Sequence, residues 1–150
     1  MPPAATLPET SQTTVDRTRE ILWRDDYASQ ALGIRLVEVR AGYCRAEMQV
    51  RRDMLNGFGI IHGGMLTTFA DTAMAFASNS HGEMAVATNL GMDFVASARE
   101  GEILSTEVRE LSRTRRTGLY DATITAADGR LIAVMRGRVQ RLAGKPVGGT

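Results

Sequence analysis

One strongly helical segment, residues 56–80, constrains the fold of this chain more than any other feature. It opens with the glycine-rich run NGFGIIHGG, and from Met65 onward its apolar residues recur in pairs every four positions. Such spacing predicts a helix with one apolar face that packs against another layer of the protein. Asp71 lies off that face, in a row of small and polar residues. Because four alanines between Phe69 and Ser78 keep the helix thin, we expect a sheet to wrap around it.

The rest of the sequence reads mainly as strands. Apolar and polar residues alternate before and after the helix, and Ala41-Gly42 and Asp128-Gly129 mark hairpin turns. A helical pattern at residues 15–32 predicts one or two short helices. We therefore expect an α+β fold with two strands, the long helix and four more strands, in which the helix covers the concave face of an antiparallel sheet. The expected strands are 34–40, 43–50, 85–95, 102–112, 119–127 and 131–142.

Length and composition indicate one ordinary globular domain. The chain has 150 residues, of which 43% are hydrophobic and 23% charged, and its net charge is +1. This balance gives no general argument for a nucleic-acid or membrane partner, and no window is long enough to span a membrane. We expect residues 1–14 to form a disordered N-terminal lead, residues 15–142 the domain, and residues 143–150 a loose tail.

Cysteine and histidine usage narrows the possible chemistry. Cys44 is the only cysteine, which excludes an internal disulfide, and with only His62 and His81 available it argues against a zinc site. No metal or other cofactor is expected. Residues 1–14 lack the basic and apolar regions of a signal peptide, so we expect a reducing, cytoplasmic setting. Cys44 is interpreted as a packing residue because no basic activator is near it in the sequence.

Six short motifs together carry a resemblance to a known family. They are MLNG at 54–57, HGG at 62–64, ADTA at 70–73, ASNS at 77–80, DF at 93–94 and TGLYD at 117–121. On these motifs the chain, from about Tyr27 to Leu142, resembles the hotdog-fold acyl-CoA thioesterases, in particular the bacterial phenylacetate-pathway type often called PaaI. The order Asn56, HGG and Asp71 at this spacing is the most specific part of the resemblance.

The resemblance has implications for fold, activity and assembly. It implies a curved antiparallel sheet around one central helix, and hydrolysis of aromatic CoA thioesters, of phenylacetyl or hydroxyphenylacetyl type, to the free acid and CoA. It also implies homodimers that share active sites and commonly assemble as tetramers. Two segments depart from the family pattern. Val95-Ala96-Ser97 replaces a Leu-Arg-Pro run, and the loop 57–61, a candidate contact for the acyl group, also differs.

Hydrolysis of a thioester needs hydrogen-bond donors for the developing oxyanion, and a carboxylate that directs a water or attacks directly. Gly63, at the expected helix start, can offer a backbone N–H to a closely approaching carbonyl, and the helix dipole reinforces it. The resemblance gives this position the same role, and gives Asn56 the task of polarising the carbonyl or holding the water. Asp71 is then the base or the nucleophile. Each residue alone could simply belong to a turn or a solvated helix face, but together they predict a catalytic site.

Neighbouring residues are candidates for supporting roles. His62 could serve as a general base, but we favour a role in bracing the His62-Gly63-Gly64 turn, because no carboxylate partner is evident. His81 is assigned to the loop that ends the helix. Thr88, at the start of the next strand, is a candidate hydroxyl near the water.

A charged turn is the candidate contact for the phosphates of CoA. It contains Arg113, Arg115 and Arg116. Such a cluster is either a solvated turn or a phosphate-binding surface, because guanidinium groups match phosphate geometry well.

Two alternative functions stay open, a medium-chain acyl-CoA thioesterase and a non-catalytic acyl-CoA-binding protein. A hotdog hydratase generally carries an Asp and a His close together on one helix, whereas Asp71 has no histidine near it on its helix. Spacing also predicts the assembly. Eight residues separate Gly63 from Asp71, about 12 Å along a helix axis. One helix is not expected to bring both to one carbonyl, so we predict a site shared between two antiparallel, two-fold related chains.

Overall fold

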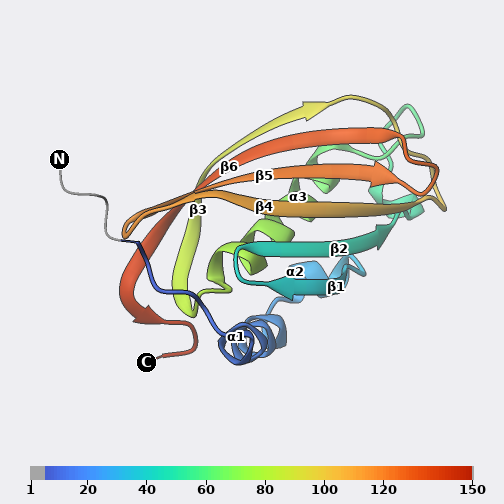
Figure 1. Ribbon diagram of the computed structural model, residues 1–150. Coiled ribbons are helices and arrows are strands. Elements are labelled where there is room, and N and C mark those ends of the chain that lie inside the picture. The colour runs from blue at the N-terminus through green and yellow to red at the C-terminus, as the bar shows by residue number, and fades with distance from the viewer. Residues whose placement is uncertain (1–5, 150) are drawn as a thin grey trace.

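A computed structural model describes residues 6–149 and shows one sheet curved around a long helix (Figure 1). The elements are α1 (Gln12–Arg24), α2 (Tyr27–Ala31), β1 (Arg35–Arg40), β2 (Tyr43–Gln49), the 3-10 helix η1 (Arg52–Met54), α3 (Gly63–Asn79), β3 (Glu83–Phe94), β4 (Ile103–Arg113), β5 (Thr117–Ala126) and β6 (Leu131–Pro146). The strands form one antiparallel sheet in the order β1-β2-β4-β5-β6-β3. The predicted α+β hotdog architecture is confirmed.

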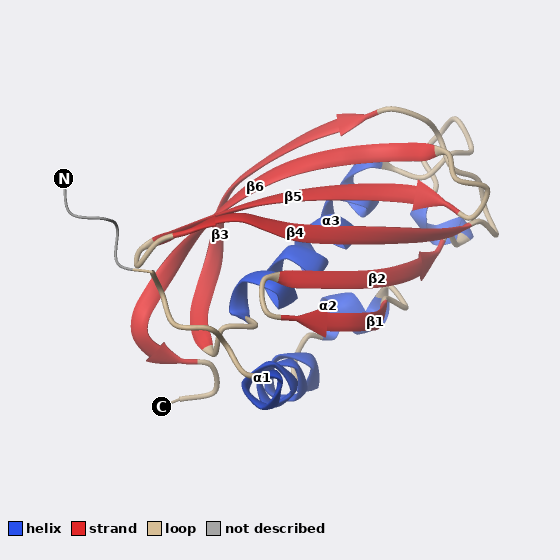
Figure 2. Cartoon of the chain, in the orientation of Figure 1, coloured by secondary structure: helices blue, strands red, loops and turns tan. Residues whose placement is uncertain are grey.

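Helix α3 lies on the concave side of the sheet (Figure 2), and its predicted apolar face is largely buried. Its buried apolar residues are Leu66, Phe69, Ala70, Ala73, Met74, Phe76 and Ala77. The sheet makes room for this face, because a Cβ added to Gly137 of β6 would overlap the sulfur of Met74. Cys44 is also buried, and burial raises the pKa of its thiol to about 12, which confirms it as a packing residue.

Both ends of the described chain are more structured than the sequence suggested. Helix α1 begins at Gln12, inside the segment expected to be a disordered lead, because the Ser11 hydroxyl caps it by accepting a hydrogen bond from the Thr14 N–H at 3.3 Å. Strand β6 continues to Pro146, beyond the expected end at residue 142. Residues 1–5 and 150 of the expected lead and tail lie outside the described residues.

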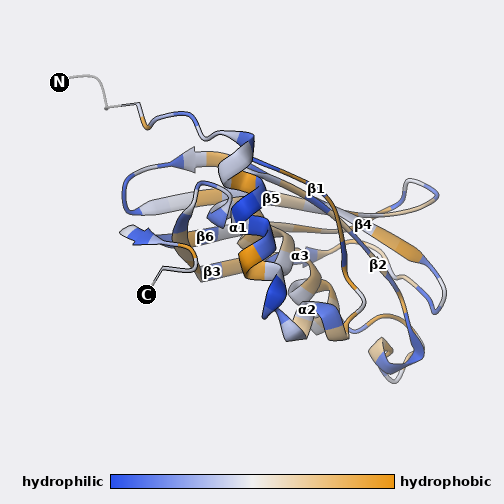
Figure 3. Ribbon diagram, turned by 90° about the horizontal axis from the view of Figure 1, so that it is seen from below, coloured by the Kyte–Doolittle hydropathy of each residue, from blue (hydrophilic) through white to orange (hydrophobic). Residues whose placement is uncertain are grey.

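The two edges of the sheet are treated differently. Helix α1, which carries both hydrophobic and hydrophilic segments in Figure 3, covers the β1 edge. There Gln12 donates to the Val39 carbonyl at 3.1 Å and Arg19 donates to the Leu36 carbonyl at 3.0 Å. Strand β3 forms the other edge, and within residues 6–149 it has a paired strand on one side only. Most of β3 is exposed, so the chain leaves one sheet edge open.

None of the helices within residues 6–149 has the length and apolar character needed to cross a membrane.

Candidate active site

The start of α3 and the end of β3 form a pocket that contains two of the predicted catalytic residues. Asn56, from the loop after η1, and Gly63, the first residue of α3, both line it. The pocket has a volume of about 440 Å³. Its remaining walls are mostly apolar and are made by Ile60, Ile61, Leu66, Phe94, Val95, Ala96 and Ser97. Two polar groups thus face an apolar cavity, an arrangement common in ligand sites.

The Asn56 side chain closes the loop that precedes α3. Its Oδ1 accepts hydrogen bonds from the backbone N–H groups of Phe58 at 2.9 Å and Ile60 at 3.4 Å. The Oδ1 acceptor is therefore occupied. The Nδ2 group, the donor of the same side chain, has no acceptor among residues 6–149. Asn56 therefore serves the turn and still has an N–H group to donate to a carbonyl or a water in the pocket.

The first two N–H groups of α3 differ in their partners. His62 is the N-cap residue, and its Nδ1 accepts a hydrogen bond from the Gly64 N–H at 3.0 Å. This bond requires an unprotonated Nδ1, and it makes His62 a brace for the turn. The Gly63 N–H has no acceptor in the described chain and lies at the positive end of the helix dipole. Gly63 is therefore the free donor at the helix start, whereas the Gly64 N–H is occupied.

The lack of a side chain at Gly63 has a steric cause in the structure. A Cβ added there would lie 2.9–3.3 Å from three ring atoms of Phe94, at the end of β3. Gly63 is not among the glycines with positive φ, so its backbone does not itself require glycine. From the sequence, glycine at this position is expected to let a substrate carbonyl come close. In the structure, glycine also leaves space for the Phe94 ring. This contact joins segments that are distant in the sequence, so local sequence could not reveal it.

Asp71 occupies the middle of the less buried face of α3, as its position off the apolar stripe predicted. Its carboxylate makes no hydrogen bond or ion pair to any residue within 6–149, although it is partly buried. Burial, and to a lesser extent the charge of Asp26, raises the pKa of Asp71 above its usual value. An unpaired carboxylate with a raised pKa is suited to take a proton or to attack a carbon.

Helix α2 places a second carboxylate near Asp71, which the sequence analysis did not foresee. Asp26 caps α2 by accepting from the Ser29 N–H at 3.1 Å and the Ser29 hydroxyl at 2.7 Å. The Ser29 hydroxyl also bonds the Thr72 hydroxyl at 2.8 Å, and both residues are buried. This chain of bonds fastens α2 to α3 next to Asp71. The capping pattern Asp26 to Ser29 was readable in the sequence, but its contact with the long helix was not.

The predicted catalytic residues of one chain do not converge on one point. Asn56 and Gly63 share a pocket, but Asp71 does not line it. Two turns of α3 separate Gly63 from Asp71, about 12 Å along the axis. The described chain therefore contains the donors and the acid as separate groups.

Thr88 lies away from the Asn56 and Gly63 pocket. It sits where the pairing of β3 with β6 shifts register, and its hydroxyl donates to the Arg138 carbonyl at 3.3 Å. A polar groove of about 750 Å³ runs beside it, with Thr117 and Arg138 among its lining residues. Since Phe94 of the donor pocket is six residues further along β3, about 20 Å separate Thr88 from that pocket.

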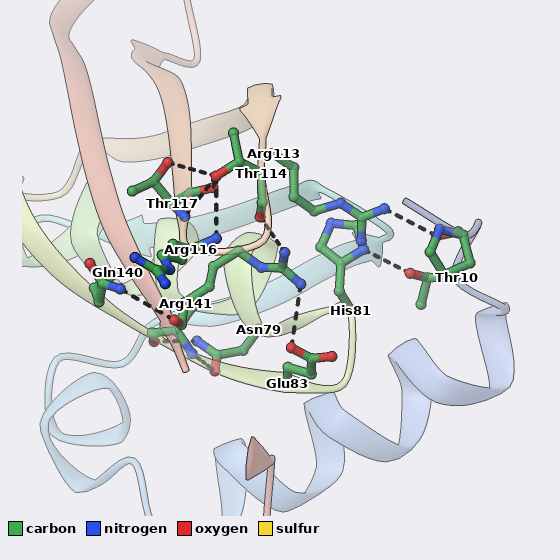
Figure 4. A network of polar contacts seen from close by, with 12 residues as sticks. Thr10, Asn79, His81, Glu83, Arg113, Thr114, Arg116, Thr117, Gln140 and Arg141 are labelled. Atoms are coloured by element: carbon green, nitrogen blue, oxygen red, sulfur yellow. Dashed lines mark hydrogen bonds and ion pairs between the residues drawn. The ribbon is translucent and has the colours of Figure 1, made fainter. Parts of the chain in front are cut away.

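Hydrogen bonds and an ion pair hold the arginine turn between β4 and β5 in place (Figure 4). Arg113 donates to the Pro8 carbonyl at 3.1 Å and pairs with Glu110 at 3.8 Å, and its side chain is 14% exposed. Beneath the turn, buried Arg141 donates to the Thr114 carbonyl. Arg113 therefore already has protein partners in the structure, and its contact with a CoA phosphate stays a prediction.

Arg115 and Arg116 remain exposed on the same turn, and their guanidinium groups bond no residue within 6–149. The turn is far from the donor pocket of its own chain. Ile61 of the pocket donates to the Ala98 carbonyl, just before β4, whereas the turn follows the last residue of β4. The length of β4 puts about 33 Å between them.

A partly buried polar network at the end of α3 was not foreseen from the sequence. His81, which had been assigned to a helix-ending loop, bonds the Thr10 hydroxyl through Nδ1 at 2.7 Å and Glu110 through Nε2 at 2.8 Å. Tyr120 donates to the same Glu110 oxygen at 2.7 Å. Burial alone would raise the pKa of Glu110, but the bonds from His81 and Tyr120 outweigh it and hold the pKa below its usual value. The network joins the N-terminal segment to β4 and β5.

No group of three or more His, Cys, Asp or Glu side chains within the described residues is arranged to hold a metal ion.

Residues 58–133 match the thioesterase superfamily. The chain belongs to that superfamily. It is also 34% identical over 127 residues to the acyl-coenzyme A thioesterase PaaI of Escherichia coli K12, a match that spans 85% of this chain and 91% of the relative. It is therefore a homologue of the PaaI thioesterases, which confirms the resemblance read from the motifs.

Solved structures agree with this assignment. The E. coli PaaI protein from the phenylacetic acid degradation operon superposes with a TM-score of 0.86 at 32% identity, covering 89% of this chain and 96% of that protein. A mutant of the phenylacetic acid degradation protein PaaI from Thermus thermophilus gives 0.75 at 34% identity, covering 78% and 100%. A protein of Streptococcus mutans UA159 bound to acetyl CoA shares the fold, with a TM-score of 0.72 at 23% identity over 75% and 90% of the two chains.

Proposed function

We propose that this thioesterase superfamily member hydrolyses aromatic acyl-CoA thioesters of the phenylacetyl or hydroxyphenylacetyl type to the free acid and CoA. The observation that carries the proposal is the pair of unoccupied donors, the Gly63 N–H and the Asn56 Nδ2 group, in one apolar pocket. Membership of the superfamily and similarity to two PaaI proteins support it. The single buried cysteine is compatible with a cytoplasmic enzyme.

In the proposed reaction, the thioester carbonyl oxygen accepts hydrogen bonds from Gly63 and Asn56. Asp71 takes a proton from a water as the water oxygen bonds to the carbonyl carbon, and the carbonyl electron pair moves onto the oxygen. The two donors stabilise that oxyanion, and loss of one such donor typically lowers kcat by about 10²–10³. Collapse of the intermediate breaks the C–S bond, and the CoA thiolate leaves and takes the proton from Asp71. The other possible route is direct attack of Asp71 on the carbonyl carbon, which breaks the C–S bond, expels the CoA thiolate and forms an anhydride that water then cleaves to the free acid and the Asp71 carboxylate.

The separation of donors and acid supports a site built by two chains. One chain places Gly63 and Asp71 about 12 Å apart along α3, and its β3 edge is open. Exposed apolar side chains, including Met84 and Val86 at 37% and 47% exposure, lie on this edge strand. Antiparallel pairing of two β3 edges would bring the donor pocket of one chain to the end of the sheet that carries the arginine turn of the other. We propose such a homodimer, with two equivalent shared sites, and a tetramer made from two dimers.

Subunit complementation tests the shared site. Asp71→Asn chains and Asn56→Ala chains should each be inactive as homodimers. After subunit exchange, half of the sites in a mixed dimer would combine an intact Asp71 with an intact Asn56 from the other chain, so activity should return. Exchange is followed independently by a mass tag on one chain. Proven exchange without recovery of activity would show that each chain builds its own site.

The proposed contact for the CoA phosphates is the exposed pair Arg115 and Arg116, without Arg113. Their turn is fixed from below by Arg141 and Thr114, so the two guanidinium groups project from a stable base. Preorganised arginines lose less freedom on binding a phosphate than arginines on a mobile loop.

A hydrolysis screen tests the activity itself. Phenylacetyl-CoA, hydroxyphenylacetyl-CoA, hexanoyl-CoA, octanoyl-CoA and palmitoyl-CoA would be compared by release of free thiol, with Asp71→Asn as the matched inactive variant. The proposal expects the highest kcat/KM for the aryl-acetyl esters. Preference for hexanoyl or octanoyl esters would instead favour a medium-chain thioesterase. Tight binding without any thiol release would favour a non-catalytic acyl-CoA-binding protein.

A further inference from the structure

An aromatic ring, Phe94, lies directly against the donor at the helix start. Three of its ring atoms approach the Cβ position of Gly63 to 2.9, 3.1 and 3.3 Å. Phe94 also lines the same pocket as Gly63 and Asn56. The residue is nevertheless 56% exposed, so one part of the ring packs on the helix while the rest is free to contact another molecule.

The backbone around Phe94 is anchored. The N–H groups of Val95 and Ala96 both donate to the Ile132 carbonyl, at 2.8 and 3.1 Å, which ties the end of β3 to β6. Ile61, which also lines the pocket, donates its N–H to the Ala98 carbonyl at 2.9 Å. The segments that form the pocket walls are thus joined by main-chain bonds, and the backbone that carries the ring is held beside the donors.

The composition of the pocket identifies which part of a thioester it would receive. The polar donors are Asn56 and Gly63, and the other walls are aliphatic except for Phe94 and Ser97. A carbonyl held by these donors would place its acyl carbon chain or ring among the apolar walls, since the CoA portion is polar and charged. Ile60 and Ile61 come from the loop 57–61, which the sequence analysis named as a candidate contact for the acyl group.

We propose that Phe94 is a specificity-determining residue, whose ring forms the wall of the acyl site and selects aromatic over saturated acyl groups. The inference rests on the proposed thioesterase function and deepens it. Aromatic rings contact each other edge to face or offset-stacked, and gain stabilisation beyond that from apolar area alone. A saturated ring of similar size would fill the same space without this gain. The selectivity therefore lies in the difference between two acyl groups of matched shape.

The test compares phenylacetyl-CoA with cyclohexylacetyl-CoA as substrates for the full-length wild type, Phe94→Leu and Phe94→Tyr. Leucine keeps an apolar wall and removes the aromatic ring, whereas tyrosine keeps the ring. The expected result is a fall of about three- to tenfold in the ratio of kcat/KM values, phenylacetyl over cyclohexylacetyl, for Phe94→Leu. Phe94→Tyr should retain the wild-type ratio. Ile103→Leu, an exposed apolar residue outside the pocket, is the control and should also retain it.

The outcomes separate this inference from the function on which it rests. If the wild type hydrolyses both esters and Phe94→Leu leaves their ratio unchanged, Phe94 does not select aromatic groups. Equal losses on both esters would likewise overturn the inference and leave the ring with a packing role. Failure of the wild type to hydrolyse any thioester would overturn the proposed function, and the inference with it. Because the ratio is measured on one protein preparation, a partly unfolded variant still gives a valid result.

Discussion

Substitution of Gly63 by alanine tests whether the Phe94 ring is the steric reason for glycine at the start of α3. The new Cβ would lie 2.9–3.3 Å from three ring atoms. Ordinary carbon contacts are about 3.5–4.0 Å, so the ring must move by roughly 0.5–1 Å. Because Phe94 is 56% exposed, it can turn outward, and we expect Gly63→Ala to cost about 1–2 kcal/mol rather than to prevent folding.

The same substitution should behave differently when the ring is absent. In a Phe94→Ala background the three closest neighbours of the new methyl group are gone, and alanine is preferred over glycine in helices by up to about 1 kcal/mol. Gly63→Ala should then be neutral or stabilising. The two substitutions are therefore expected to be coupled by about 1–3 kcal/mol.

Urea unfolding of the four proteins, at one fixed protein concentration, measures this coupling. Additive effects, within about 0.5 kcal/mol, would refute the steric account. The kcat/KM values of the same four proteins give separate information. If Gly63→Ala remains poorly active after Phe94→Ala has relieved the clash, glycine is also needed for the approach of the substrate carbonyl.

Four further predictions concern charge. Asp71→Asn should lower kcat by about 10²–10⁴, and a folded variant with normal kcat would exclude Asp71 as the catalytic group. The melting temperature of this variant at pH 7 should be unchanged or higher, because the raised pKa of Asp71 means that its charge opposes folding above that pKa. Asp26→Asn keeps a capping residue but removes a negative neighbour, so the acid limb of the kcat/KM profile should move to lower pH; an unmoved limb would contradict the coupling. Glu110→Gln should lower the free energy of unfolding at pH 7 by about 1–3 kcal/mol. This difference should shrink as the pH falls through the lowered pKa of Glu110, which can be checked by measuring the stability of both proteins as the pH is lowered. Replacing Arg115 and Arg116 with glutamine should raise KM several-fold for phenylacetyl-CoA but not for phenylacetyl-pantetheine, which lacks the nucleotide; equal effects on both would exclude a phosphate contact.

The sequence was sufficient for the fold because the relevant signals are periodic and local. The four-residue repeat of apolar pairs in α3 and the alternation in the strands each reflect a regular geometry, so the order of elements could be predicted. The Asp128-Gly129 pair likewise predicted a hairpin turn. Boundaries were less accurate. Helix α1 starts at Gln12 because Ser11 caps it, and β6 is extended to Pro146 by pairing with Glu83, a contact that local pattern does not encode.

The candidate site was predictable only in part. Asn56 and Gly63 are close in sequence, and the short loop between them made their meeting foreseeable. Phe94 and Asp26 reach the site from other elements, and no local pattern connects them to Gly63 or Asp71. The arginine turn likewise depends on contacts between distant segments. Arg113 looks the same as its neighbours in sequence, and only the folded N-terminal segment and Glu110 show that it is already bonded.

The unequal edges of the sheet set a limit on how many chains can join by strand pairing. A sheet with two free edges can keep adding copies, which is how fibres grow. Here Gln12 and Arg19 occupy carbonyls along β1, so growth in that direction is blocked. Each chain can then pair with one partner only, through β3, because two chains that have joined there offer no free strand to a third. Helix α1, far from the chemistry, thereby makes edge pairing self-terminating, and its loss would turn a closed association into an open one.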